Sequence, residues 1–294
     1  MSKIAVTGMS GVIGSVFALE SGPEYELIDL YHSKPSSSSK IAKSLQLDLL
    51  KKKDIVRTLS EAMPDVIVHL AAITHIDQCE LDRSKGKKGI VWKVNVDATT
   101  EIAKFSSKNN IPLIFLSTEC VFDGEQEYFS EDSKKNPKSW YGITKSEAED
   151  QIMSLGGKFA ILRSVVAYHV EDNHKTLYGK IVKKLKENKK VFGVTDQLFT
   201  PTHSYDIVKG IITTINDDLT GILHIAPSKS LTPYDFARII AKENKFPVGL
   251  IEPTTLAKMY SSGGADLRLR NSSLDCKKSR KKMKFIPKPP HEVI

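Results

Sequence analysis

The sequence has few of the features that mark membrane, disulfide-linked or metal-binding proteins. Its 294 residues include only three cysteines, Cys79, Cys120 and Cys276, an odd number without metal-ligand spacing. We therefore predict isolated thiols in a reducing compartment and no metal site. No apolar run reaches the roughly 18–20 residues that a membrane helix needs, and residues 3–8, KIAVTG, read as a strand rather than a secretory leader. We expect a cytoplasmic protein without a membrane partner.

Acidic residues are also in short supply, because 43 Lys and Arg outnumber 35 Asp and Glu and give a net charge of +8. Much of the excess lies in residues 181–190, IVKKLKENKK, and residues 277–285, KKSRKKMKF. Neither run is interleaved with aromatic residues, and no helix-turn-helix, RNA-binding or zinc-finger signature accompanies them. We predict solvated helix faces and no nucleic-acid partner. A positive surface would still attract an anionic small molecule such as a nucleotide.

What the sequence does have is an alternation of apolar strand-like runs with helical patterns over residues 1–165. The predicted strands are residues 3–8, 25–30, 44–49, 64–72, 111–118 and 159–168. Buried strands that alternate with helices indicate an α/β fold, with a doubly wound parallel sheet and right-handed crossovers. We assign residues 1–165 to this sheet domain, rejoined by a segment at about 200–225. The looser pattern of residues 166–294 predicts a small lobe that closes over the carboxyl edge of the sheet, where ligands of such folds bind.

A glycine-rich turn follows the first predicted strand. In TGMSGVIG, Gly8 permits a tight turn, Gly11 lets the backbone approach a pyrophosphate, and Gly14 lets the helix pack closely on the strand. The helix that begins here would offer free N–H groups to the anion. The alternative is a plain strand-to-helix turn, but the order strand, glycines, helix favours dinucleotide binding.

The end of the second strand bears on the choice between NAD and NADP. An acid there binds the ribose 2′-hydroxyl of NAD, whereas a cation accommodates the 2′-phosphate of NADP. Asp29 lies near the expected place. If Asp29 is in mid-strand, the strand ends in His32, Ser33 and Lys34, which suit a phosphate, and we favour NADP with NAD as the alternative. Asp48 either binds the adenine amino group or is an ordinary strand-ending aspartate.

Tyr141 and Lys145 are four residues apart at a predicted helix start, so both project from one face. An ammonium beside a phenol lowers the tyrosine pKa, which would make Tyr141 a general acid near neutral pH. Thr118 ends a buried strand at the same sheet edge and could donate a hydrogen bond to a substrate carbonyl. Glu119 could bind a sugar hydroxyl, relay a proton, or remain a solvated loop acid.

Motifs along the whole chain resemble the extended short-chain dehydrogenase/reductases, and within them the dTDP-4-dehydrorhamnose reductase family. They are TGMSGVIG (7–14), DVIVHLAAITHIDQCE (65–80), VNVDAT (94–99), LSTECVFDG (116–124), YGITKSEAED (141–150), LRSVVAY (162–168), DQLFTPTHSYDI (196–207) and RLRNSSLD (268–275). The resemblance implies a Rossmann-type domain with a small C-terminal substrate-binding lobe. It also implies reduction, by a nicotinamide cofactor, of a 4-keto group on a nucleotide-linked 6-deoxyhexose.

Residue by residue, the cradle and the resemblance together assign three sets. The cofactor would lie against Gly8, Ser10, Gly11, Val12, Ile13, Gly14, Lys34, Asp48, Leu49, Leu70, Ala71, Ala72, Tyr141 and Lys145. The catalytic set would be Thr118, Tyr141 and Lys145, and the substrate would contact Thr74, Glu119, Gln197 and Arg270.

The sequence departs from the family in the substrate region, where Glu119 replaces the usual aspartate and residues 163–169, RSVVAYH, lack the usual tryptophan. A nucleotide-sugar epimerase is therefore an alternative. Another is a non-catalytic regulatory subunit like the β subunit of methionine adenosyltransferase, a relative that keeps the fold and cofactor site. The sequence leaves open the sugar, the nucleotide, the stereochemistry at C4, a bound metal and the oligomeric state, with a homodimer among the possibilities.

Overall fold

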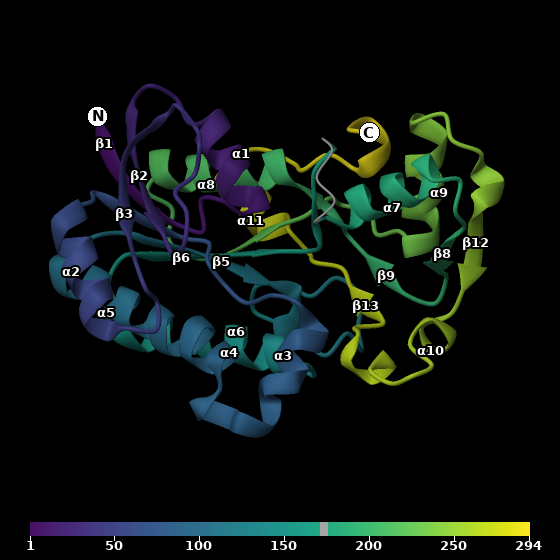
Figure 1. Ribbon diagram of the computed structural model, residues 1–294, viewed down its shortest axis with the longest axis horizontal. Coiled ribbons are helices and arrows are strands. Elements are labelled where there is room, and N and C mark those ends of the chain that lie inside the picture. Colours follow the sequence, from purple (N-terminus) through teal and green to yellow (C-terminus); the bar gives the residue numbers. More distant parts are fainter. Residues whose placement is uncertain (171–175) are drawn as a thin grey trace.

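The computed structural model describes residues 1–170 and 176–294, and its centre is a seven-stranded sheet (Figure 1). The strand order is β11-β6-β5-β4-β1-β2-β3, and every pairing is parallel. The strands are β1 (Ser2–Thr7), β2 (Tyr25–Tyr31), β3 (Ile41–Gln46), β4 (Val66–His69), β5 (Leu113–Thr118), β6 (Phe159–Ser164) and β11 (Gly221–Ile225). The predicted α/β fold with a doubly wound parallel sheet is confirmed.

Helices cover both faces of this sheet, as Figure 1 shows. One face carries α1 (Val12–Glu20), α8 (Ser204–Asn216) and α11 (Lys277–Met283), and the other carries α2 (Lys52–Ala62), α5 (Ala98–Asn109) and α6 (Trp140–Leu155). Along β1, Ile4 and Val6 pack toward the first set, whereas Ala5 packs toward the second. Because both faces of the central strands are buried, β4 and β5 are largely apolar rather than alternating, whereas the edge strand β3 is mostly exposed.

Short parallel pairs and helices make up most of the C-terminal half. The pairs are β7 (Ala167–Tyr168) with β10 (Thr202–His203), β8 (Val191–Val194) with β12 (Ile251–Thr254), and β9 (Leu198–Phe199) with β13 (Asn271–Ser272). The helices are α7 (Leu177–Lys186), α9 (Pro233–Glu243) and α10 (Leu256–Met259), and a separate hydrophobic cluster packs this part together. The division at residue 165 remains an interpretation of the sequence.

Two predicted boundaries differ from the structure. The pattern of residues 201–217, PTHSYDIVKGIITTIND, predicts a helix opened by Pro201, but α8 begins at Ser204 because Thr202 and His203 first pair with β7 as β10. The third strand, expected at residues 44–49, is β3 and begins three residues earlier, where its pairing with β2 starts. Within residues 1–170 and 176–294, no helix has both the length and the apolar character to span a bilayer.

Candidate active site

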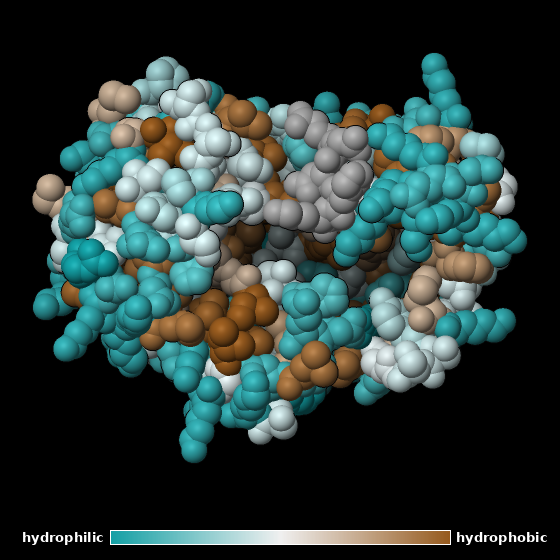
Figure 2. Space-filling model, in the orientation of Figure 1, coloured by the Kyte–Doolittle hydropathy of each residue, from teal (hydrophilic) through white to brown (hydrophobic). Residues whose placement is uncertain are grey.

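The carboxyl ends of the sheet strands border a cavity of about 470 Å³, which we name the strand-end cavity, and Figure 2 shows the hollow near the middle of this face. Its lining joins the glycine turn, the ends of β4, β5 and β6, the start of α6, and Thr176 and Leu177 at the start of α7. The lining residues include Gly8, Gly11, Val12, Ile13, Gly14, Leu70, Ala72, Thr74, Thr118, Glu119, Cys120, Tyr141 and Lys145. The catalytic set and part of the cofactor set predicted from sequence therefore meet at one place.

The glycine turn has the shape of a phosphate cradle. Gly8 has φ +76°, and a Cβ there would lie 2.8 Å from the Ala71 nitrogen. At Gly14 a Cβ would lie 2.4 Å from the Gly8 carbonyl oxygen, so the first turn of α1 packs directly on the turn. The N-terminus of α1 has no side-chain cap, and its first residue, Val12, lines the strand-end cavity. Free N–H groups at such an end suit the pyrophosphate of a dinucleotide.

A second cavity, of about 280 Å³, continues from the glycine turn to the ends of β2 and β3, and we name it the β2 cavity. Ser10, Asp48, Leu49, Ala71 and Ala72 are among its lining residues. The Leu50 N–H donates to the Asp48 carboxylate at 3.0 Å and helps to hold the pKa of that group below its usual value. A charged acceptor next to apolar walls suits the amino group and ring of an adenine.

Asp29 lies inside β2, not at its end, and is buried. Its Oδ2 accepts a hydrogen bond from the Ser36 backbone at 2.7 Å, and burial raises the pKa of the carboxyl. The strand therefore ends beyond Asp29, and His32 joins the lining of the β2 cavity. Lys34 is exposed and is not part of that lining, so its contact with a phosphate remains a prediction.

Local structure fixes the start of α6 against the end of β5. The Ser139 hydroxyl caps the helix by accepting from the Gly142 N–H at 3.1 Å. Gly142 allows a close approach, because a Cβ there would lie 2.1 Å from the Cys120 carbonyl oxygen. This contact brings Tyr141 beside Thr118 at the edge of the sheet. Both side chains line the strand-end cavity.

The electrostatics of Tyr141 differ from the sequence-based expectation. Burial, and then the nearby Cys120 and Glu119, raise the pKa of the phenol well above its usual value, and a hydrogen bond with Thr118 opposes the rise. Lys145 is not among the groups that shift this pKa, and its Nζ donates to the Leu116 carbonyl at 2.7 Å. Tyr141 is consequently a neutral phenol at pH 7, which is the form that can donate a proton.

Lys145 is itself buried in an apolar setting. Its Nζ lies 3.7 Å from the centroid of the Phe115 ring, and only 2% of the residue is exposed. Loss of hydration lowers the pKa of the Lys145 ammonium to about 7, and the charge of Glu149 opposes this shift. Lys145 therefore changes its charge within the physiological pH range.

Glu119 is buried rather than solvated, so the interpretation as a surface loop acid is wrong. The Thr118 hydroxyl donates to Glu119 Oε2 at 2.7 Å. Burial raises the pKa of the Glu119 carboxyl to about 7, although the hydrogen bond from Thr118 lowers it in part. A carboxyl that gains and loses a proton near neutrality thus adjoins the hydroxyl predicted to bind the substrate.

The predicted substrate residues are divided between two places. Thr74 and Glu119 line the strand-end cavity. Arg270 instead lines a separate cavity of about 680 Å³, which we name the arginine cavity, together with Arg83, Lys138 and Arg268. Gln197 donates to the Leu269 carbonyl at 2.7 Å beside it. Contact of Gln197 and Arg270 with a substrate remains a prediction.

Arg268 was missed by the sequence reasoning, although it is the first arginine of the quoted motif RLRNSSLD. It pairs with Asp77 of α3 (Ile76–Asp82) at 2.7 Å and stacks on Tyr260 at 4.2 Å. Burial raises the pKa of the Cys120 thiol, a lining group of the strand-end cavity, and the Arg268 charge opposes this rise in small part.

Among the residues that the structure describes, no three His, Cys, Asp or Glu side chains gather in an arrangement that could hold a metal ion.

The chain is similar to known proteins over most of its length. A family model described as RmlD substrate binding domain matches residues 2–293. The dTDP-4-dehydrorhamnose reductase of Sinorhizobium fredii is 29% identical over 251 residues, which cover 81% of this chain and 77% of that protein. The methionine adenosyltransferase 2 subunit beta of Bos taurus is 28% identical over 242 residues, which cover 79% of this chain and 69% of that protein.

A solved structure shows the same fold. The dTDP-4-dehydrorhamnose reductase from Bacillus anthracis, in complex with NADP, superposes with a TM-score of 0.85 at 23% identity and covers 99% of this chain and 96% of its own. Since the family model spans nearly the whole chain, this protein belongs to the RmlD substrate-binding domain family and is an extended short-chain dehydrogenase/reductase like the dTDP-4-dehydrorhamnose reductases.

Proposed function

We propose that this protein reduces the 4-keto group of a nucleotide-linked 6-deoxy sugar with NADPH. The observation that carries the proposal is the meeting of Thr118, Tyr141 and Lys145 in the strand-end cavity, beside the glycine cradle of α1. Family membership and the relative from Sinorhizobium fredii support the same substrate class. Deoxysugar and polysaccharide biosynthesis would be the setting of such a reaction.

The residues of this chain would hold the cofactor in two parts. The α1 N-terminus would bind the pyrophosphate, and the β2 cavity would take the adenosine, with Asp48 and Leu49 at the adenine. NADPH, when bound, supplies the hydride that adds to the carbonyl carbon. We favour NADP over NAD because Asp29 lies inside β2 and accepts a hydrogen bond from Ser36, and the strand is followed by His32, Ser33 and Lys34.

The protein's own side chains would stabilise the carbonyl oxygen and supply its proton. Thr118 and Tyr141 would donate hydrogen bonds to the carbonyl oxygen and stabilise the negative charge that develops there. The neutral Tyr141 phenol would then transfer its proton to that oxygen, which becomes the hydroxyl of the product. Lys145 would bind ribose hydroxyls of the cofactor.

A direct assay tests this proposal. The purified protein is mixed with NADPH and a nucleotide-linked 4-keto-6-deoxyhexose, and the loss of NADPH absorbance is followed while the sugar product is identified by mass spectrometry. Sugar-dependent oxidation of NADPH supports the reductase. Binding of NADPH without turnover of any such sugar would refute it.

A regulatory role is the second candidate, because the bovine methionine adenosyltransferase 2 subunit beta is almost as similar as the reductase from Sinorhizobium fredii. The absence of tryptophan from residues 163–169 fits this alternative too. A chain that binds NADPH, reduces no keto-sugar and co-purifies with a methionine adenosyltransferase catalytic subunit would support it.

A further inference from the structure

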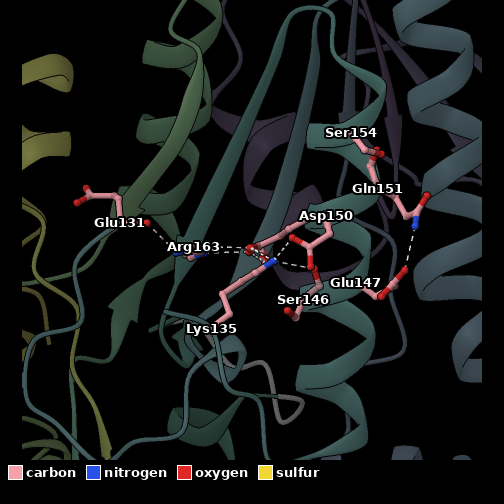
Figure 3. Close-up of polar contacts among 10 residues, drawn as sticks. Glu131, Lys135, Ser146, Glu147, Asp150, Gln151, Ser154 and Arg163 are labelled. Atoms are coloured by element: carbon pink, nitrogen blue, oxygen red, sulfur yellow. Dashed lines mark hydrogen bonds and ion pairs between the residues drawn. The ribbon is translucent and has the colours of Figure 1, made fainter. Parts of the chain in front are cut away.

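A buried carboxylate lies behind the predicted catalytic residues on the same helix. Tyr141, Lys145 and Glu149 follow each other at four-residue intervals along α6 and so share one face. Glu149 is fully buried, and Arg163 of β6 is 1% exposed. Arg163 holds both carboxylate oxygens, through Nε at 2.9 Å and Nη2 at 2.7 Å, as part of the network in Figure 3.

The same carboxylate also holds the strand that ends in Thr118. The Ser117 hydroxyl donates to Glu149 Oε1 at 2.6 Å. Ser117 and Arg163 are directly opposite each other in the pairing of β5 with β6. One side chain of α6 therefore fixes the helix against two strands, one residue before Thr118 and one turn after Lys145.

Among the titratable groups that the structure describes around Lys145, the Glu149 carboxylate is the negative charge that favours the ammonium form. His69 of β4 interacts with the Lys145 charge, but burial lowers the pKa of His69 to about 3 and keeps it neutral. Tyr141 of the same helix stays neutral, and Glu119 beyond β5 titrates near pH 7. Glu149 is the charged group whose interaction raises the pKa of Lys145 against the effect of burial.

Two positively charged side chains, Lys135 and Arg163, bind the Glu149 carboxylate. Lys135 lies 3.4 Å from its Oε2 and 2.7 Å from Asp150, and Figure 3 shows Arg163, Lys135 and Asp150 close together. Hydrogen bonds to Ser117 and Arg163, together with burial, keep this carboxylate ordered, and the pKa of Glu149 is lowered by its positive neighbours. It therefore remains charged across the pH range in which Lys145 titrates.

We propose that Glu149 is a positioning residue that keeps Lys145 charged at working pH and fixes the distance between α6 and Thr118. The inference rests on the proposed reductase, in which the Lys145 ammonium binds cofactor ribose hydroxyls. A purely structural ion pair would stabilise the fold without setting the charge of Lys145, and this difference can be measured.

The test uses the full-length chain and three variants. Glu149→Gln removes the charge and keeps the shape of the side chain. Glu149→Gln with Arg163→Met also removes the buried guanidinium, which would otherwise lack a partner. Asp150→Asn is the matched control, since it removes an exposed carboxylate from the same helix that also pairs with Lys135. The measurements are the NADPH dissociation constant from pH 5.5 to 9, the pH profile of kcat, and thermal unfolding.

We expect both Glu149 variants to lose NADPH affinity at lower pH than the wild type does. At pH 8 the loss should be about tenfold relative to the wild type, and at pH 6 it should be smaller, because an opposite charge nearby typically shifts a pKa by at least one unit. The double variant should keep this shift although it unfolds at a higher temperature than Glu149→Gln. The Asp150→Asn control should follow the wild-type pH profile.

Two results would overturn the inference. One is a Glu149→Gln variant whose NADPH affinity falls with pH at the same midpoint as in the wild type. The other is a stable double variant with that same midpoint, which would show that the ion pair only stabilises the fold. If no keto-sugar is reduced by the wild type, the proposed function fails, but the pH midpoint of NADPH binding still reports on Glu149.

Discussion

The Thr118 hydroxyl donates its hydrogen to Glu119 Oε2 at 2.7 Å, so the residue predicted to bind the substrate carbonyl is already engaged by a carboxylate. When Glu119 is protonated, its own O–H can donate to Thr118 and release the threonine hydrogen toward a substrate. When Glu119 is charged, the threonine hydrogen stays in its hydrogen bond to Glu119 Oε2. The protonation state of Glu119 therefore controls whether Thr118 is available.

We expect kcat to fall as pH rises through about 7, because Glu119 and Lys145 both have a pKa of about 7 and both lose a proton there. Glu119→Gln should flatten this decline, since its amide N–H₂ can donate to Thr118 at any pH, although the part due to Lys145 would remain. Steady-state kinetics from pH 5.5 to 9 measure the effect. An unchanged slope in Glu119→Gln would show that Glu119 does not gate Thr118.

Glu119→Gln should also stabilise the fold at alkaline pH. The folded-state pKa of about 7 lies above the ordinary value of 4.5, so the wild type loses stability as pH rises from 4.5 through 7. The full cost, about 3 kcal/mol from a shift of this size, is present at pH 8 and nearly absent at pH 4.5. Urea unfolding of both proteins at pH 5 and pH 8 should give a gain for the variant mainly at pH 8. An equal gain at both values would contradict a raised pKa.

Tyr141→Phe should lower kcat by about 10²–10⁴-fold, the usual contribution of a positioned general acid. NADPH affinity should change little, because Phe preserves the ring and its packing. Tyr128→Phe is the matched control, since Tyr128 is exposed, does not line the strand-end cavity, and has its hydroxyl 3.4 Å from Ser230 Oγ. A Tyr141→Phe variant with wild-type kcat would remove Tyr141 from the mechanism.

Lys34→Ala should weaken NADPH binding roughly tenfold and leave NADH binding unchanged, because only NADPH carries the 2′-phosphate and one charged hydrogen bond contributes about 1.5 kcal/mol. Lys53→Ala provides the comparison, as another exposed lysine placed on α2. Isothermal titration with both cofactors gives the answer. Equal effects on NADH and NADPH would assign Lys34 to general surface charge.

Local sequence patterns determined the frame of this protein. The glycine cradle is a strand, a turn and a helix start within residues 2–20, and each part is set by neighbours in the chain. Tyr141 and Lys145 face the same way because four residues make about one helical turn. The apolar strands predicted the parallel sheet, since strands covered on both faces have no polar alternation.

Only the tertiary structure decided the charges and partners within this frame. Glu119 reads as a loop acid in sequence, but packing buries it and raises its pKa, which the neighbouring residues alone do not reveal. The same holds for Lys145, whose Nζ donates to a backbone carbonyl of β5, and for Asp29, whose Oδ2 accepts a hydrogen bond from the Ser36 N–H. Arg268 reaches Asp77 across 191 residues of chain. Burial and long-range contacts depend on how distant segments pack, and periodicity carries no information about them.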